Sequence, residues 1–237
     1  MIWHELECGR YTADLPLWLD LARAAGGPVL DIGAGTGRVA LALARAGHRV
    51  TAIDLDDQLL ERLRARASEA GVDVRAEVGD AREFDLGERF ALCVVPMQTI
   101  QLLGGPGGRA GFLRCARTHL APSGRLAVAI VEELEEFEVS AGAPGPLPDV
   151  LERNGVVYSS IPVAVRVLDE RVELERRREV VSPAGELNVS EDRVLLDQVS
   201  SSALEQECQA AGLRPVGRLE LAQTTDYAGS TVVIADA

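Results

Sequence analysis

Apolar and polar positions in the first quarter of the chain follow the order strand, helix, strand. Residues 29–32 form a short apolar run that includes an acidic side chain, and residues 49–53 form a second run rich in β-branched residues. Between the two runs, apolar residues recur at the spacing of one helix face, at Val39, Ala40, Leu43 and Ala44. Because a connection through a helix makes two neighbouring strands parallel, this pattern predicts the first half-unit of a parallel α/β sheet.

The same alternation of helical and strand-like patterns returns along most of the chain. The periodicity predicts further helices over 56–70, 109–120 and 201–211. It predicts further strands over 72–78, 90–95, 125–131, 214–222 and 230–235. At 237 residues, the chain is long enough for one α/β domain with an embellishment.

The α/β order breaks between residues 134 and 199. Short runs with alternating or β-branched residues follow one another there, over 156–159, 163–168, 171–180 and 193–199. We therefore expect a small antiparallel β insertion after strand five, serving either as a lid over the substrate or as a dimer surface. The expected organisation is one domain, with a helical N-terminal cap over 1–27, a core over 28–133 and 200–237, and the insertion over 134–199.

Three glycines follow the first strand. Gly33, Gly35 and Gly37 allow the chain to turn sharply and let a ligand approach the backbone. Asp54, at the end of the second strand, is placed where a ribose would reach it. The dinucleotide-binding pattern G-x-G-x-x-G would need glycine at position 38, where this chain has Arg38, and this difference disfavours a NAD-dependent oxidoreductase.

An acidic residue followed by G-x-G-x-G at the end of the first strand resembles the first motif of the class I S-adenosylmethionine-dependent methyltransferases. Asp31 and the three glycines match that motif position by position. The resemblance implies a Rossmann-like, seven-stranded, mostly parallel sheet with helices on both faces, whose last strand inserts antiparallel between strands five and six. It also implies S-adenosyl-L-methionine as cofactor and S-adenosyl-L-homocysteine as product.

By the same resemblance, the cofactor would lie along the glycine loop and the ends of the neighbouring strands. Asp54 would bind both ribose hydroxyls and Asp80 would accept from the adenine amino group, although Asp80 also fits a plain Asx turn before Arg82. The full set of expected cofactor contacts is Tyr11, Asp31, Gly33, Ala34, Gly35, Gly37, Asp54, Leu55, Asp80, Ala81, Pro96 and Met97.

The acceptor is expected to be a small molecule, methylated on an amine or a hydroxyl. In-line displacement at the sulfonium carbon depends mainly on positioning, so a general base is optional. Gln98 and Gln101 are candidates to orient the substrate, and the weak candidates for a catalytic residue are Glu132, Tyr158 and Tyr227. A methyltransferase-like binding or regulatory protein without turnover remains an alternative.

The amino-acid composition excludes or disfavours several classes of partner and of enzyme. The net charge of −13, with acidic and basic residues interleaved, disfavours nucleic acid as a partner. The chain has no lysine, which excludes Schiff-base enzymes and P-loop phosphotransferases. The cysteines show no metal-ligand or redox spacing, and no apolar run reaches the roughly 18 residues of a membrane span. We therefore expect a reduced, cytoplasmic protein without a metal or a membrane partner. A homodimer is possible.

Overall fold

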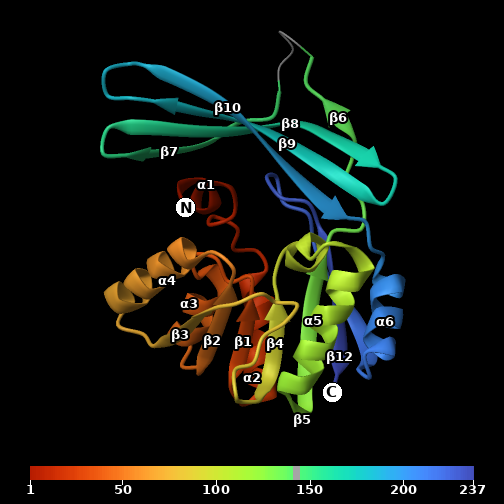
Figure 1. Cartoon of the computed structure of the whole chain (residues 1–237). Helices are drawn as coiled ribbons and strands as arrows, with labels where there is room; N and C mark the ends of the chain where they lie inside the picture. The colour runs from red at the N-terminus through yellow and green to blue at the C-terminus, as the bar shows by residue number, and fades with distance from the viewer. Residues whose placement is uncertain (141–144) are drawn as a thin grey trace. The chain divides into compact units, whose positions relative to one another are not determined.

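A seven-stranded sheet forms the centre of the unit made of Tyr11–Glu132 and Val199–Ala237, called the core unit below (Figure 1). The computed structural model describes residues 1–140 and 145–237. The strand order is β11-β12-β5-β4-β1-β2-β3. The strands are β1 (Val29–Ile32), β2 (Val50–Asp54), β3 (Val74–Val78), β4 (Phe90–Val95), β5 (Leu120–Ile130), β11 (Arg214–Leu221) and β12 (Ser230–Asp236).

Strands β1 to β5 pair in parallel, whereas β12 pairs antiparallel with both β5 and β11. The last strand of the chain thus lies between the fifth and sixth strands of this sheet. The mostly parallel seven-stranded sheet that the sequence predicts is confirmed, including the place of its final strand.

Helices cover both faces of this sheet (Figure 1). The helical elements of the core unit are α2 (Leu15–Ala25), α3 (Arg38–Arg45), α4 (Asp57–Ala70), the 3₁₀ helix η1 (Thr99–Leu102), α5 (Gly105–His119) and α6 (Ser201–Ala210). Side chains of α5 and α6 pack with Leu30 and Ile32 on one face, and side chains of α2, α3 and α4 pack with Val29 on the other. Because successive side chains of β1 point to opposite faces, a continuous apolar run serves two cores.

Local sequence signals explain several element boundaries. The Asp56 carboxylate accepts hydrogen bonds from the first turn of α4, and Gly71 ends that helix in the left-handed conformation. Helix α5 begins at Gly105, four residues earlier than predicted, because Gly104 turns the chain at φ 84° and Pro106 fits the first helical turn. Strand β5 also begins early, at Leu120, and residues 121–124 bulge out of its pairing with β4.

The second unit consists of Met1–Arg10 and Glu133–Gln198 and is called the antiparallel unit. Helix α1 (Ile2–Glu7) belongs to it, together with a five-stranded sheet of order β10-β9-β8-β6 in which β7 also pairs with β8. The strands are β6 (Phe137–Glu138), β7 (Asp149–Arg153), β8 (Val156–Leu168), β9 (Arg171–Val181) and β10 (Leu187–Asp197). The predicted antiparallel insertion is confirmed, and its residues 141–144 lie outside the described part of the chain.

Two strand predictions within the insertion were wrong in detail. The runs 156–159 and 163–168 form one strand, because Pro162 lies at a register shift where its missing N–H is tolerated. Strand β10 begins at Leu187 rather than at residue 193, since its exposed first half is stabilised by pairing with β9. A turn at Asp169 and Glu170 joins β8 to β9.

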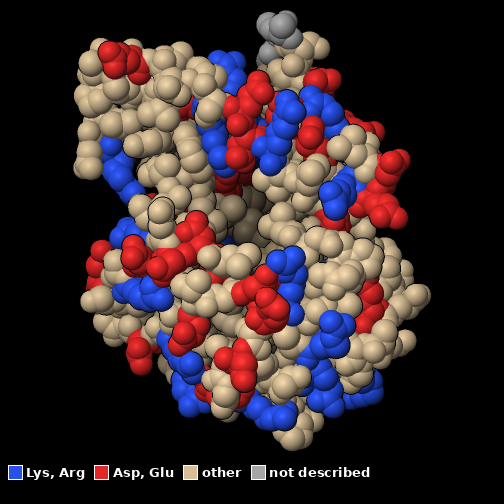
Figure 2. Space-filling model, viewed as in Figure 1, with Lys and Arg blue, Asp and Glu red and all other residues tan. Residues whose placement is uncertain are grey.

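Charged side chains of both signs are interleaved over the face seen in Figure 2. This distribution matches the mixed charge pattern of the sequence, in which acidic residues outnumber arginines. Among the described residues, none of the helices combines the length and apolar character needed to cross a bilayer.

Candidate cofactor site

The glycine loop follows the carboxyl end of β1. The backbone N–H groups of Gly33 and Ala34 both donate to the carbonyl of Ile53, at 2.9 and 3.0 Å, and so bind the loop to the end of β2. Gly33, Gly35 and Gly37 all have positive φ angles. A Cβ atom on Gly33 would lie 2.5 Å from Cγ2 of Thr99, so this position requires glycine for packing as well as for its backbone angle.

Asp54 joins the loop to the end of β2. Its Oδ2 accepts from the N–H of Gly35 at 2.8 Å, and its Oδ1 accepts from the N–H of Asp56 at 3.0 Å. Each carboxylate oxygen has a further lone pair, so Asp54 retains the capacity to accept from two hydroxyl groups. The next residue, Leu55, is 66% exposed and presents an apolar side chain beside this carboxylate.

Asp31 is a buried carboxylate beneath the same loop. Its side chain is 1% exposed, and neither oxygen has a hydrogen bond of normal geometry among the described residues. Burial raises the pKa of Asp31 to about 7, an effect that Arg38 and the nearby amide of Ala40 partly oppose and that the carboxylates of Asp54 and Asp14 reinforce. The site therefore holds a buried carboxyl group whose negative charge is only partly offset by its surroundings.

Arg38 and Asp14 form an ion pair that the sequence analysis missed. Nη1 and Nη2 of Arg38 lie 2.5 and 2.8 Å from the two carboxylate oxygens of Asp14, which also accepts from Nε1 of Trp18 at 2.8 Å. In the sequence, Arg38 is notable only because it occupies the position where a dinucleotide-binding pattern would need glycine. Asp14 stands just before Pro16 at the start of a helix, where an acidic residue is usual, so no local signal distinguished it.

Tyr11 lies beside this ion pair. The Arg38 guanidinium donates to the Tyr11 carbonyl at 3.0 Å and lies 5.2 Å from the centroid of the Tyr11 ring. Tyr11 is 5% exposed, and its buried hydroxyl has no hydrogen-bond partner among the described residues. Burial and the neighbouring Asp14 raise the pKa of Tyr11, so its hydroxyl stays a neutral donor.

Asp80 follows β3 and is bound by its neighbour Arg82. Its carboxylate accepts from the backbone N–H of Arg82 at 2.9 Å and from the Arg82 guanidinium at 2.5 to 3.0 Å. These hydrogen bonds lower the pKa of Asp80. The geometry is that of the Asx turn considered from the sequence, with buried Ala81 as its next residue.

The segment after β4 contains Pro96, Met97, Gln98 and Gln101. Met97 has a φ of 55°, a left-handed conformation that is uncommon for a residue with a side chain. Gln101 is 3% exposed, and its amide donates to the carbonyl of Val131 at 3.0 Å and accepts from the N–H of Val131 at 2.9 Å. Gln101 therefore fixes η1 to the end of β5, whereas the side chain of Gln98 is partly exposed.

The three candidate catalytic residues have different surroundings. Glu132 accepts from the N–H of Ser201 at 2.5 Å and from Oγ1 of Thr231 at 3.0 Å. Burial raises the pKa of Glu132, but these hydrogen bonds outweigh burial and lower it overall. Tyr158 lies on β8 of the antiparallel unit, edge-on to Trp3 at 5.7 Å between ring centroids, while Tyr227 lies in the core unit against Tyr11.

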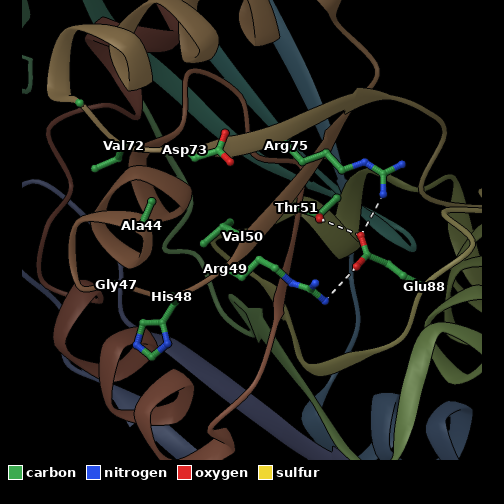
Figure 3. Close-up of a pocket in the computed structure, with 11 residues that line it drawn as sticks. Ala44, Gly47, His48, Arg49, Val50, Thr51, Val72, Asp73, Arg75 and Glu88 are labelled. Atoms are coloured by element: carbon green, nitrogen blue, oxygen red, sulfur yellow. Dashed lines mark hydrogen bonds and ion pairs between the residues drawn. The ribbon is translucent and has the colours of Figure 1, made fainter.

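A cavity of about 720 Å³ lies at the amino ends of β2 and β3 (Figure 3). Glu88 accepts there from Arg49 at 3.1 Å, from Arg75 at 2.9 Å and from Thr51 at 3.3 Å, and the side chain of His48 lies at its border. The glycine loop and Asp54 follow the carboxyl ends of their strands, at the opposite edge of the same sheet. This cavity is therefore separate from the candidate cofactor site. The cofactor site, and not the cavity, lies at the carboxyl ends of the strands, where open α/β sheets generally bind their ligands.

Comparison with known proteins identifies the fold and a methyltransferase domain within the chain. Residues 29–124 match the model of a methyltransferase domain. The cypemycin N-terminal methyltransferase of a Streptomyces species is 34% identical over 113 residues, which are 47% of this chain and 45% of the relative. A demethylmenaquinone methyltransferase of Tropheryma whipplei is 33% identical over 158 residues, which are 65% of this chain and 62% of the relative. The chain thus spans less than two thirds of these curated relatives.

Among solved structures, the S-adenosylmethionine-bound amino pentose methyltransferase CalS10 of Micromonospora echinaspora has the same fold. It superposes with a TM-score of 0.74 over 100% of this chain and 96% of CalS10, at 22% identity. The chain therefore has the fold of this methyltransferase, and its residues 29–124 match a methyltransferase domain. CalS10 was solved with S-adenosylmethionine bound.

The match to a methyltransferase domain agrees with the motif from Asp31 to Gly37 and with Arg38 standing where a dinucleotide site would need glycine. The matched range 29–124 contains the glycine loop, Asp54, Asp80 and the segment after β4. Tyr11 and Tyr227 lie outside it, and the contacts of Tyr11 with Tyr227 and Arg38 are seen only in the tertiary structure. Within the described residues, no group of three or more His, Cys, Asp or Glu side chains has an arrangement suited to a metal ion.

Proposed function

We propose that this protein is a methyltransferase, which transfers the methyl group of S-adenosylmethionine to an amine of a small-molecule acceptor. The observation that carries the proposal is the Asp54 carboxylate, which is hydrogen-bonded to the glycine loop and has lone pairs left for a ribose. Asp54 is the last residue of β2 in the seven-stranded sheet, and it lies within the range that matches a methyltransferase domain.

The described residues fit the chemical groups of the cofactor. Leu55, which is exposed beside Asp54, would pack against the adenine, and Asp80 with Ala81 would border it on the β3 side. The buried carboxyl of Asp31, whose charge is only partly offset by its described neighbours, suits the positive charge of the cofactor's ammonium and sulfonium groups. The buried hydroxyl of Tyr11, which has no partner among the described residues, is a donor that suits the cofactor's carboxylate.

Pro96 and Met97 are proposed to border the sulfur end of the cofactor. They follow the carboxyl end of β4, beside the glycine loop, and Thr99 contacts both parts of the site. Oγ1 of Thr99 donates to the Pro96 carbonyl at 3.0 Å, and this bond helps to hold Met97 in its left-handed conformation. Strained backbone of this kind persists where the surrounding structure fixes a functional loop.

The bound cofactor supplies an electrophilic methyl group on a positively charged sulfur. The chain's own residues hold that group rigidly, so that an acceptor in the pocket meets it in line. An amine with a free lone pair needs no general base at the transition state. This agrees with Glu132, whose lowered pKa and hydrogen bonds to Ser201 and Thr231 suit a residue that stabilises the end of β5.

The amine preference is supported by the printed activities of two similar proteins, an N-terminal methyltransferase and an amino pentose methyltransferase. The demethylmenaquinone methyltransferase shows that acceptors differ among the relatives. Hydroxyl acceptors therefore belong in the same assay, with Gln98 as the proposed acceptor-orienting residue. Binding of the cofactor without turnover on any acceptor would instead favour a regulatory protein.

Calorimetric titration with S-adenosylmethionine and S-adenosylhomocysteine, with NAD as control, tests the cofactor. We expect the wild type to bind both sulfur compounds and not NAD. Asp54→Ala should weaken binding about 10- to 100-fold, because hydrogen bonds to a charged group contribute about 1.5–3 kcal/mol. Asp57→Ala, in the exposed first turn of α4, is the matched control and should bind like the wild type. Absence of binding by the wild type would overturn the proposal.

A further inference from the structure

Tyr227 contacts Tyr11 although the two residues lie at opposite ends of the chain. Their ring centroids are 4.7 Å apart with an interplanar angle of 40°. This spacing lies within the range in which aromatic pairs contribute beyond their buried area. Tyr11 thus has an aromatic neighbour and a cationic neighbour, since the Arg38 guanidinium lies 5.2 Å from its ring centroid.

The turn that carries Tyr227 is internally fixed. The N–H of Thr224 donates to the Tyr227 carbonyl at 2.9 Å, and the N–H of Tyr227 donates to Oγ1 of Thr224 at 3.0 Å. The same hydroxyl accepts from the N–H of Asp226 at 3.3 Å. Gly229 permits the chain to return closely, because a Cβ there would lie 3.1 Å from the carbonyl oxygen of Leu221. The backbone at Tyr227 is therefore held before any ligand binds.

We propose that Tyr227 is a positioning residue whose ring holds Tyr11 against Arg38, so that the Tyr11 hydroxyl is presented to the methionine end of the cofactor. This inference rests on the proposed function, because it concerns how the same site binds S-adenosylmethionine. It assigns the role to the ring of Tyr227, since the ring is the part that packs on Tyr11. It also gives Tyr227 a different role from that of a general base.

A measurement without cofactor tests the packing itself. The chain has three tyrosines, Tyr11, Tyr158 and Tyr227, so Tyr227→Phe and Tyr227→Ala both retain the phenols of Tyr11 and Tyr158. Ultraviolet titration of these phenols should show Tyr11 ionising above its ordinary pKa in Tyr227→Phe, as burial requires. In Tyr227→Ala the same group should ionise nearer its ordinary pKa, because water reaches the ring. Superimposable titration curves of the two variants would overturn the inference.

Cofactor affinity tests the positioning. Loss of an aromatic pair should raise the dissociation constant of S-adenosylmethionine about 3- to 10-fold in Tyr227→Ala. Tyr227→Phe should restore wild-type affinity, and at saturating cofactor kcat of the alanine variant should match that of the wild type. If Tyr227→Phe instead lowers kcat with an altered pH profile, the hydroxyl acts in the reaction and the inference is wrong.

A double-mutant cycle with Tyr11→Ala shows whether Tyr227 acts through Tyr11. We expect Tyr227→Ala to have little further effect on cofactor affinity in that background, because contacting residues are coupled. An equal effect in both backgrounds would refute the inference. Wild-type protein that binds no S-adenosylmethionine would refute the proposed function itself, whereas wild-type binding with unchanged affinity in Tyr227→Ala would refute this inference alone.

Discussion

Gly33 and Gly26 show two different reasons why a position requires glycine, namely a left-handed backbone angle and a lack of space for a side chain. Both have left-handed φ angles, of 69° and 65°, but only a Cβ on Gly33 would meet Thr99, whereas one on Gly26 would meet nothing within 4 Å. Alanine at either position should cost about 1–2 kcal/mol of stability through backbone strain. Only Gly33→Ala should also displace the loop and abolish binding of S-adenosylmethionine. Urea unfolding and calorimetric titration of both variants check this, and equal loss of binding would contradict it.

The raised pKa of Asp31 makes the stability of the protein depend on pH. Its pKa of about 7 in the folded state lies above the ordinary value of 3.8, so between these values the folded protein binds more protons than the unfolded chain. The contribution of Asp31 to stability is therefore fully present at the acid end and is lost as pH rises towards 7.

Asp31→Asn should remove this pH dependence. The free energy of unfolding of the variant minus that of the wild type should increase as pH rises from about 4 to about 7, with a limiting slope of about 1.4 kcal/mol per pH unit. Urea unfolding at a series of pH values measures the difference. A difference that stays constant across this range would show that Asp31 is not held with a raised pKa.

At the scale of elements, the segment from β4 to η1 contains two glutamines with different expected roles. Gln101→Leu would leave the N–H and carbonyl of buried Val131 without their amide partner and should cost about 1–3 kcal/mol. Gln98→Leu, three residues earlier and partly exposed, is the matched variant. It should keep wild-type stability and raise the acceptor KM. Chemical unfolding and steady-state kinetics separate the two roles, and similar effects on stability would contradict the distinction.

The elements themselves follow the sequence closely where their signals are local. Strand β4 and the end of α4 have the boundaries that the apolar pattern and Gly71 predict. The differences occur where pairing with a distant strand decides. Pro162 remains inside β8 because neighbours on both sides hold the strand, and the first half of β10 forms although its residues are exposed.

For the whole molecule, cofactor binding should raise thermal stability. A ligand that binds only the folded state at 100 times its dissociation constant stabilises by about 2.7 kcal/mol. For a unit of this size that corresponds to a rise in Tm of roughly 5–10 °C. Thermal scans with S-adenosylmethionine, S-adenosylhomocysteine and NAD test this, with Asp54→Ala as the variant expected to lose the rise. A rise with NAD alone would favour the oxidoreductase alternative.

Local patterns in the amino-acid sequence are enough to predict the class of the fold and the centre of the candidate site. Asp31, the three glycines and Asp54 lie within 24 residues of one another, and strand, turn and helix signals of this kind are local. The parallel order of the first strands follows from the helices that connect them. For the same reason the glycine loop and Asp54 could be placed at one edge of the sheet without coordinates.

How distant residues come together at that site depends on the tertiary structure. It brings Tyr227 to Tyr11, binds Gln101 to the backbone of Val131 and gives Glu132 its partners Ser201 and Thr231. It also pairs Arg38 with Asp14. These contacts join segments that are remote in the chain, and the periodicity of apolar residues reports which face of an element is buried but not which side chain it meets.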